Sequence, residues 1–249
     1  MWLLFLISCI ALWGFTSILY KKGADKDDKY IHYNGGVFHS DMVQIFPETC
    51  SQYSETSSQL DADMISVSGH KFGCPKGIGF LYIRDGLDIK PLIYGAGQEN
   101  GFRVGTENLP YIVGLSAALS SLNFNNRYTD NKGLISDTRI ALTYELLKIP
   151  KCHLNGHEIC RLTNNINISF KGIKGTDLAT LLNDKGIYVS TGSACNSGTN
   201  EPSYVLEAIG VSDDYIDGTI LLTVNNLTND DIEYVVQSVR ECVDILRSL

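Results

Sequence analysis

The sequence has no cluster of lysine or arginine residues, and its 20 basic residues are outnumbered by 28 acidic ones, giving a formal net charge of −8. Proteins that bind the phosphate backbone of nucleic acids present grouped basic side chains, so this composition argues against such a partner. No internal repeat and no low-complexity segment is present either. With 249 residues, 44% of them hydrophobic, the chain is long enough for one good-sized globular domain or two small ones.

The sequence also lacks the cysteine spacing of a disulfide framework. Its seven cysteines lie at irregular positions, and an odd number in a chain of this length is more typical of a reducing compartment. Cys152, His153, His157 and Cys160 lie close together and suggest zinc ligands. The residues around them fit a strand, a turn and a second strand, so we expect no metal here.

One long hydrophobic run is present, at the N-terminus. Residues 2–20 carry no charged side chain and are followed by Lys21 and Lys22. A helix of this length spans a bilayer, so the run predicts a membrane anchor with the lysines and the remaining chain on the cytoplasmic side. A secretory signal fits less well, because no basic residue precedes the run and no small-residue cleavage site follows it. A third interpretation is that these residues are unrelated to the fold and are joined to a truncated coding region.

The remaining chain predicts an α/β protein. Short apolar segments at 35–41, 64–70 and 77–84 are bounded by glycine and polar residues, which is typical of strands in a largely parallel sheet. Further elements are expected as helices over about 108–122, 134–148, 176–186 and 202–210 and as strands at 164–170, 187–190 and 219–224. The predicted division is a hydrophobic segment at 1–23, a first domain at 24–122 and a second domain at 123–249.

The last helix is predicted most sharply. Thr228 is followed three residues later by Asp231, which is the pattern of an N-terminal capping box. Apolar residues then recur at helical spacing, which indicates a face that packs in the core rather than a binding surface. These residues are Ile232, Val235, Val236, Val239, Val243 and Leu246. Cys242 falls within the same stripe, so core packing is its expected role.

The carboxyl ends of parallel strands collect ligand-binding side chains, and this rule points to Asp41 and to the pair His70 and Lys71. A lone lysine is normally a solvated surface group, and that is the simpler interpretation of Lys71. The position of Lys71 directly after a strand favours a second interpretation, in which its amine bonds to the carbonyl carbon of pyridoxal phosphate (PLP). That cofactor needs a carboxylate beside its pyridine nitrogen, which Asp41 would supply, and Gln44 would contact the ring hydroxyl.

Three segments carry a family resemblance: "SGHKFGCPKGIGFLY", "GAGQENGFRVGTENLPYIVGL" and "VSTGSACNSGTNEPSYVLEAIG". They look like the cysteine desulfurases of the class V aminotransferase group, in the same order, and are most similar to the NifS/IscS branch. The similarity extends from about Gly35 to the C-terminus. It implies fold-type I of the PLP-dependent enzymes, with a partial large α/β domain for the cofactor and a small C-terminal α/β domain. Cys74 stands where the family commonly has glycine, so we expect it to be a small filler.

The resemblance also implies roles for individual residues. Lys71 matches the lysine that bonds to PLP, and Cys195 matches the cysteine that takes sulfur from L-cysteine, leaving alanine and a persulfide. Attack requires a thiolate, and the small residues around Cys195 would let its loop move between the cofactor and a sulfur-acceptor protein. The cofactor contacts implied are Asp41 and Gln44 at the ring, Ser68 and His70 at the phosphate, and Thr106 at the phosphate bound by the other subunit. A homodimer that serves sulfur metabolism and iron–sulfur cluster assembly is therefore expected.

Two departures from the family pattern leave the activity open. Roughly the first third of the family's chain has no counterpart, including the histidine stacked on the ring and the turn that holds the phosphate. Leu221 stands where the family has the arginine that binds the substrate carboxylate, and leucine cannot make that bidentate contact. Three interpretations follow: a desulfurase completed by a partner chain, a non-catalytic binding or scaffold protein, and a gene fragment without a stable fold.

Overall fold

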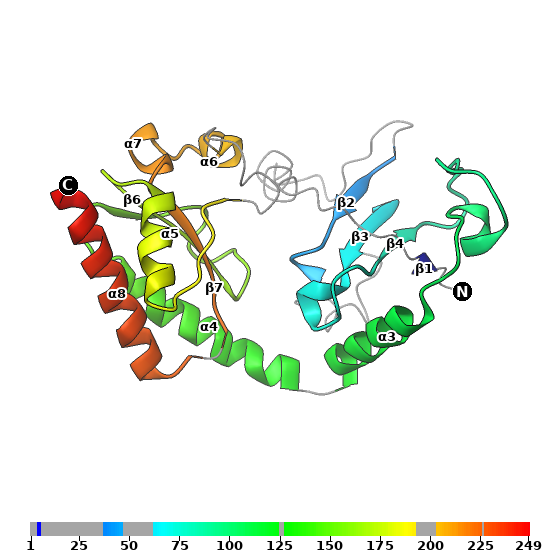
Figure 1. Cartoon of the computed structure of the whole chain (residues 1–249), viewed down its shortest axis with the longest axis horizontal. Coiled ribbons are helices and arrows are strands. Elements are labelled where there is room, and N and C mark those ends of the chain that lie inside the picture. Colours follow the sequence, from blue (N-terminus) through cyan, green and yellow to red (C-terminus); the bar gives the residue numbers. More distant parts are fainter. Residues whose placement is uncertain (1–3, 6–36, 47–61, 125–126, 193–202, 226) are drawn as a thin grey trace, which may run out of the picture. The chain divides into compact units, whose positions relative to one another are not determined.

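The computed structural model describes residues 4–5, 37–46, 62–124, 127–192, 203–225 and 227–249 (Figure 1). The chain forms two compact units, residues 1–128 and 129–249, and each is built on one sheet.

The first unit contains a four-stranded sheet in the order β1-β4-β3-β2. The strands are β1 (Leu4–Phe5), β2 (His39–Asp41), β3 (Met64–Ser68) and β4 (Gly79–Ile83). β2 and β3 are parallel, but β4 runs antiparallel to both β3 and β1. The prediction of a largely parallel sheet is therefore wrong for β4. Only residues 69–78 connect it to β3, and so short a connection reverses the chain rather than crossing over.

The membrane helix predicted over residues 2–20 lies outside the described residues except at Leu4–Phe5. Those two residues form β1 and pair with Tyr82 and Leu81 of β4, so the helical prediction is wrong for them. Among the helices of the described residues, none is long and apolar enough to cross a membrane.

Helix α3 (Leu109–Phe124) covers one face of this sheet (Figure 1). Val67 of β3 and Phe80 of β4 are paired neighbours, and both pack against α3 in the core of the unit. Alternate residues of a strand point to opposite faces, so Ser66 and Ser68 lie on the other face of the sheet. Asp41 lies opposite Ser66 in the parallel register and shares that face.

The second unit contains an antiparallel sheet in the order β5-β6-β7, formed by Cys152–Leu154, Asn165–Phe170 and Thr219–Thr223. The strand, turn and strand predicted around Cys152 are confirmed. The predicted strand at 187–190 is wrong, because only Ser190 forms a bridge, to Leu221. The amide of Ile187 instead donates to the carbonyl of Leu182 and closes the preceding helix, so it is not available to a sheet.

Five helices are described in this unit, α4 (Arg127–Leu146), α5 (Gly175–Asp184), α6 (Tyr204–Ala208), α7 (Asp213–Ile216) and α8 (Asn229–Ser248). Leucines of α4 and α5 and valines of α8 pack against Ile166, Ile168 and Phe170 of β6. Figure 1 shows these three helices beside the sheet. The capping box between Thr228 and Asp231 is confirmed, and so is the predicted apolar stripe of α8, including buried Cys242. Helix α4 begins earlier than predicted, and α6 is shorter.

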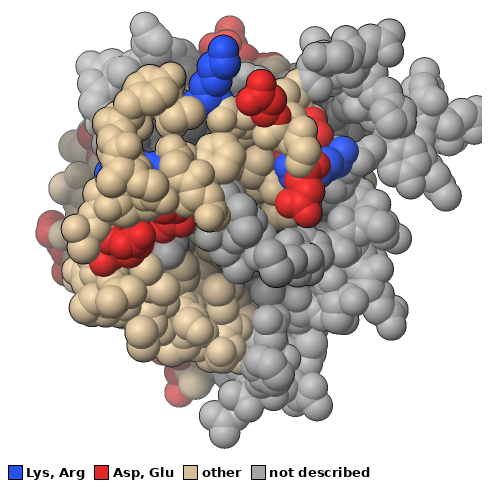
Figure 2. Space-filling model, turned by 90° about the vertical axis from the view of Figure 1, so that its right-hand side faces the viewer, with Lys and Arg blue, Asp and Glu red and all other residues tan. Residues whose placement is uncertain are grey.

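Surface charge is sparse on the side of the molecule drawn in Figure 2, where most described residues are uncharged and the acidic and basic side chains form small, separate groups. The first unit also exposes several large apolar side chains. Leu92 is 98% exposed and Tyr94 is 78% exposed, and Leu109 and Val113 of α3 are two-thirds exposed. Large apolar side chains with this degree of exposure are candidates for contact with another chain.

Candidate functional site

The parallel pair β2 and β3 brings the predicted cofactor residues to one edge of the first sheet. Asp41 ends β2, Ser68 ends β3, and the amide of Met42 donates to the carbonyl of Ser66 at 3.0 Å, which holds the two strand ends together. His70 and Lys71 follow at once in a 3-10 helix, η1 (Gly69–Phe72). The prediction that these side chains gather at the carboxyl ends of parallel strands agrees with this geometry.

The turn that presents Lys71 is tight, and its shape depends on small residues. Gly73 ends η1 with φ of 94°, a left-handed conformation that favours glycine, and the amide of Cys74 donates to the carbonyl of Gly69 at 3.1 Å. Cys74 is buried, and a Cβ placed on Gly69 would lie 2.9 Å from the Cys74 Cβ. The prediction that Cys74 is a small filler is confirmed, and burial raises the pKa of its thiol.

Asp41 is a half-buried carboxylate. Its Oδ1 accepts a hydrogen bond from the amide of Val43 at 2.9 Å. Burial raises the pKa of Asp41 above its usual range, although the bond from Val43 and the charge of nearby His39 oppose that shift. A cation placed beside this carboxylate would relieve the cost of its burial, and a protonated pyridine nitrogen is such a cation.

Ser68 and His70 form a second polar pair, with 2.8 Å between Ser68 Oγ and His70 Nδ1. Partial burial, together with the charges of Lys71 and Lys76, lowers the pKa of His70, so its imidazole is neutral at pH 7. A hydroxyl and an imidazole beside positive charge make a suitable ligand set for a phosphate group. The residues present at this edge therefore fit both ends of PLP.

The predicted ring contact Gln44 lies half-buried in the turn that follows Asp41. Two residues that were not predicted interact with each other, since His39 Nε2 lies 2.7 Å from Ser66 Oγ. Ser66 was missed by the sequence analysis, although its alternation with Val67 along β3 was a usable signal.

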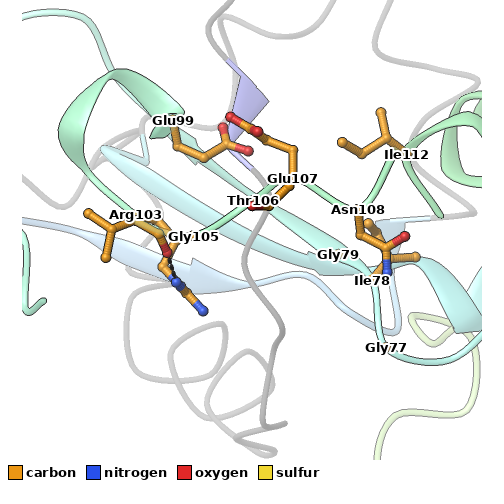
Figure 3. A pocket seen from close by; sticks show the side chains of 11 residues that line it. Gly77, Ile78, Gly79, Glu99, Arg103, Gly105, Thr106, Glu107, Asn108 and Ile112 are labelled. Carbon is orange, nitrogen blue, oxygen red and sulfur yellow. Dashed lines mark hydrogen bonds between the residues drawn. The ribbon is translucent and has the colours of Figure 1, made fainter. Parts of the chain in front are cut away.

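Thr106 lines a cavity of about 160 Å³ that Asp41, Ser68, His70 and Lys71 do not line, although Gly79 of its wall pairs with Ser68 across the strands. Gly77 and Gly79 from the start of β4 form one wall, and Figure 3 shows the side chains of Glu99 and Glu107 on another. The backbone of Glu99 has φ of 49°, a strained conformation for a residue with a side chain. Nothing in the sequence analysis indicated this cavity.

Cys195 lies outside the described residues, but the chain on its N-terminal side is anchored. The amide of Ser190 donates to the carbonyl of Leu221 at 3.0 Å, and the amide of Leu221 donates back to Ser190 at 2.6 Å. Leu221, where the resemblance implies a substrate arginine, is thus hydrogen-bonded, backbone to backbone, to the segment that leads to Cys195.

Leu221 belongs to a face of the second sheet that is otherwise polar. Asn155 Nδ2 donates to Asn167 Oδ1 at 2.6 Å and to Ser169 Oγ at 2.7 Å, and the Ser169 and Thr219 hydroxyls lie 2.6 Å apart. Leu221 is half-buried and paired with Asn167 across the strands. Leu221 is therefore an apolar side chain at a position where the resemblance implies an arginine. Its partner on the adjacent strand, Asn167, is polar and gives it no apolar contact in register.

The cysteine and histidine residues near 152–160 have other partners. His157 Nδ1 accepts hydrogen bonds from the amides of Ile159 and Cys160, and Cys152 is a strand residue whose burial raises its pKa to about 12. Within the described ranges, no group of three or more His, Cys, Asp or Glu residues is placed to hold a metal ion.

The family of the chain follows from comparison with known proteins. The family model described as "Aminotransferase class-V" matches residues 26–224, so this chain belongs to that family. Class V aminotransferases and cysteine desulfurases depend on PLP. The PLP fold-type I architecture and the resemblance to cysteine desulfurases are therefore both confirmed.

Individual relatives place the chain within that family. "Cysteine desulfurase IscS" of Methanosarcina thermophila is 46% identical over 213 residues, covering 85% of this chain and 51% of the relative. "Cysteine desulfurase" of Trichormus azollae is 40% identical over 225 residues, covering 89% and 54%. This chain thus spans about half the length of the curated relatives it matches.

Solved structures support the same family assignment. The structure titled "NIFS-LIKE PROTEIN" is 32% identical with a TM-score of 0.71, covering 84% of this chain and 53% of that one. The structure titled "SspA in complex with cysteine" is 29% identical with a TM-score of 0.56, covering 77% and 51%.

Proposed function

We propose that this chain carries the chemistry of a PLP-dependent cysteine desulfurase, in which the sulfur of L-cysteine is transferred to Cys195. The observation that carries the proposal is the gathering of Asp41, Ser68, His70 and Lys71 at one sheet edge, in a chain 46% identical to a cysteine desulfurase. The bound cysteine in one structural relative supports the same substrate.

Each residue of that edge has a distinct task. Asp41 would hold the pyridine nitrogen in its protonated form, and Gln44 would orient the ring through its hydroxyl. Ser68 and His70 would bind the phosphate. Lys71 would hold the carbonyl carbon and then carry protons to and from the substrate. PLP, when bound, supplies the electron sink for cleavage at the substrate's β-carbon.

Cys195 would act as the nucleophile. Its thiolate attacks the sulfur of L-cysteine, a sulfur–sulfur bond forms, and the carbon–sulfur bond breaks. The carbon takes up a proton, so the products are alanine and a persulfide on Cys195. That persulfide would then pass to a sulfur-acceptor protein for iron–sulfur cluster assembly.

A homodimer is part of the proposal. Thr106 would contact the phosphate held by the partner subunit, and two observations support this. Thr106 lines a cavity that Asp41, Ser68, His70 and Lys71 do not line. The first unit also exposes large apolar side chains such as Leu92 and Tyr94, which a second subunit would cover.

A second candidate is a protein that binds PLP but does not turn over L-cysteine. One observation favours it: Leu221, an uncharged side chain, stands where the family binds the substrate carboxylate. A scaffold that keeps the fold and the cofactor edge would not need that cation.

The experiment is to express the full chain with added PLP and record its visible absorbance, then reduce with borohydride and identify the modified peptide. We expect PLP on Lys71, retention of PLP in Cys195→Ala, and loss of alanine formation from L-cysteine in that variant. PLP on Lys71 without alanine formation would favour the second candidate. Failure of a folded chain to bind PLP would contradict both.

A further inference from the structure

Three polar side chains lie together on one face of the first sheet, on the strands β2 and β3. His39 and Asp41 are two residues apart on β2 and therefore share a face, and Ser66 of β3 lies opposite Asp41 in the parallel register. His39 Nε2 and Ser66 Oγ lie 2.7 Å apart. The imidazole thus reaches diagonally across the strands and bonds to the serine that faces Asp41.

The Asp41 carboxylate uses only one of its oxygens within the described part of the chain. Oδ1 accepts a hydrogen bond from the amide of Val43 at 2.9 Å, and none of the described residues donates to Oδ2. A serine hydroxyl carries a single proton, and a carboxylate is a stronger acceptor than an imidazole. Ser66 faces this carboxylate without bonding to it, which indicates that its proton is directed at His39 Nε2 instead.

We propose that His39 is a positioning residue for the pyridine nitrogen of PLP, and that it acts by holding the Ser66 hydroxyl away from Asp41 Oδ2. This inference rests on the proposed function, because it takes Asp41 as the contact of the ring nitrogen. While Ser66 is bonded to His39, Oδ2 keeps its lone pairs for the N–H of the protonated ring. A Ser66 hydroxyl released from His39 would donate to Asp41 and make the carboxylate a weaker acceptor for that N–H.

The test measures the PLP affinity of the full chain by titration of its visible absorbance. His39→Ala removes the partner of Ser66 and should weaken PLP binding about fivefold, which is what one hydrogen bond typically contributes. The double variant His39→Ala/Ser66→Ala also removes the competing hydroxyl and should restore the wild-type affinity. A second truncation on the same face cannot restore lost packing, so this rescue distinguishes positioning from a merely structural role.

A further variant separates the hydrogen bond of His39 from its charge, which also lowers the pKa of Asp41. The amide oxygen of His39→Gln can accept the Ser66 proton but carries no charge, so this variant should bind PLP as the wild type does. Ser66→Ala alone should do the same, because no hydroxyl then competes for Oδ2.

Two controls accompany these variants. His153→Ala removes a histidine from an exposed position of β5 in the second unit and should leave the PLP affinity unchanged. Urea unfolding of each variant without PLP should give the wild-type midpoint, since His39 is exposed and its truncation leaves the core intact.

Each other outcome overturns the inference. Wild-type affinity in His39→Ala would mean that Ser66 does not compete for Asp41. A double variant as weak as His39→Ala, or weak binding in His39→Gln, would mean that the imidazole acts through its packing or its charge. Weak binding in Ser66→Ala alone would mean that this hydroxyl supports the cofactor directly. Failure of the folded wild-type chain to bind PLP would instead overturn the proposed function, and this inference with it.

Discussion

Gly218 controls how β7 joins the second sheet, and its replacement by alanine is the sharpest test of this packing. A Cβ added there would lie 1.9 Å from the carbonyl oxygen of Phe170, 2.9 Å from its carbonyl carbon and 3.2 Å from the carbonyl oxygen of Ile173. Side-chain carbons essentially never approach other heavy atoms closer than 3.0 Å, so the strand start must move by about 1.1 Å (3.0 − 1.9). All three atoms belong to backbone and cannot rotate away.

The loss of stability follows from the hydrogen bonds that this movement of the strand would break. The amide of Phe170 donates to the carbonyl of Gly218 at 3.0 Å, and the amide of Gly218 donates to Tyr215 at 3.1 Å. Each such bond contributes roughly 1 kcal/mol net. Overpacking adds about 1–3 kcal/mol, so Gly218→Ala should lower the free energy of unfolding by about 3–5 kcal/mol. That is a large share of the ~5–15 kcal/mol that typically stabilises a domain.

The measurement is urea unfolding of the full chain, followed by far-ultraviolet circular dichroism, with Gly192→Ala as the matched control. Gly192 belongs to the same unit, and a Cβ there would meet no atom within 4 Å. The control should stay within about 0.5 kcal/mol of the wild type. A Gly218→Ala protein as stable as the control would refute the close approach of β7 to Phe170, and with it the register that pairs Leu221 with Asn167.

Further predictions concern binding, capping and thiol reactivity. Leu221→Arg should strengthen L-cysteine binding by at least tenfold, measured as the change in visible absorbance of the PLP-loaded chain, because a cation can hold the substrate carboxylate. Thr228→Ala should cost about 1 kcal/mol in urea unfolding, since the Thr228 side chain caps α8. Hydrogen bonds from Thr228 lower the pKa of Asp231 below its ordinary value of 3.8. The stability that they provide is thus present above pH 3.8 and lost as the pH falls through the folded pKa, and Asp231→Asn should flatten this acid dependence. Cys152, with a pKa of about 12, should resist alkylation by iodoacetamide at pH 8, whereas exposed Cys160 should react, as read by peptide mass spectrometry.

Local patterns were predictable from the sequence, and pairings between distant segments were not. The capping box at Thr228 and the apolar stripe of α8 depend on residues a few positions apart, so helical spacing was sufficient. The direction of β4 depends on the short connection that joins it to β3. The unpaired stretch before Ser190 depends on the amide of Ile187, which is already bonded to Leu182, and composition does not reveal this. The network from Asn155 to Thr219 joins three segments, and no single segment predicts it.

The candidate site also contains residues that could be predicted from the sequence and residues that could not. Asp41, His70 and Lys71 could be found because strand ends in a parallel pair meet at one edge and because the motifs resemble a known family. The cavity around Thr106 could not be predicted, since its walls come from β4 and from a turn held in strained backbone conformations.

The Ser190–Leu221 bridge shows why this fold and this activity must be tested separately. Both of its hydrogen bonds join backbone atoms, so the bridge would persist with any ordinary side chain at position 221. If the arginine that the resemblance implies were at position 221, it would thus leave the attachment of the segment that leads to Cys195 unchanged. The position lies on a polar, half-buried face beside Asn167, where a guanidinium would be tolerated as well as a leucine. Gain of cysteine binding in Leu221→Arg, at unchanged stability, would thus identify this side chain as the element that limits substrate binding in this chain.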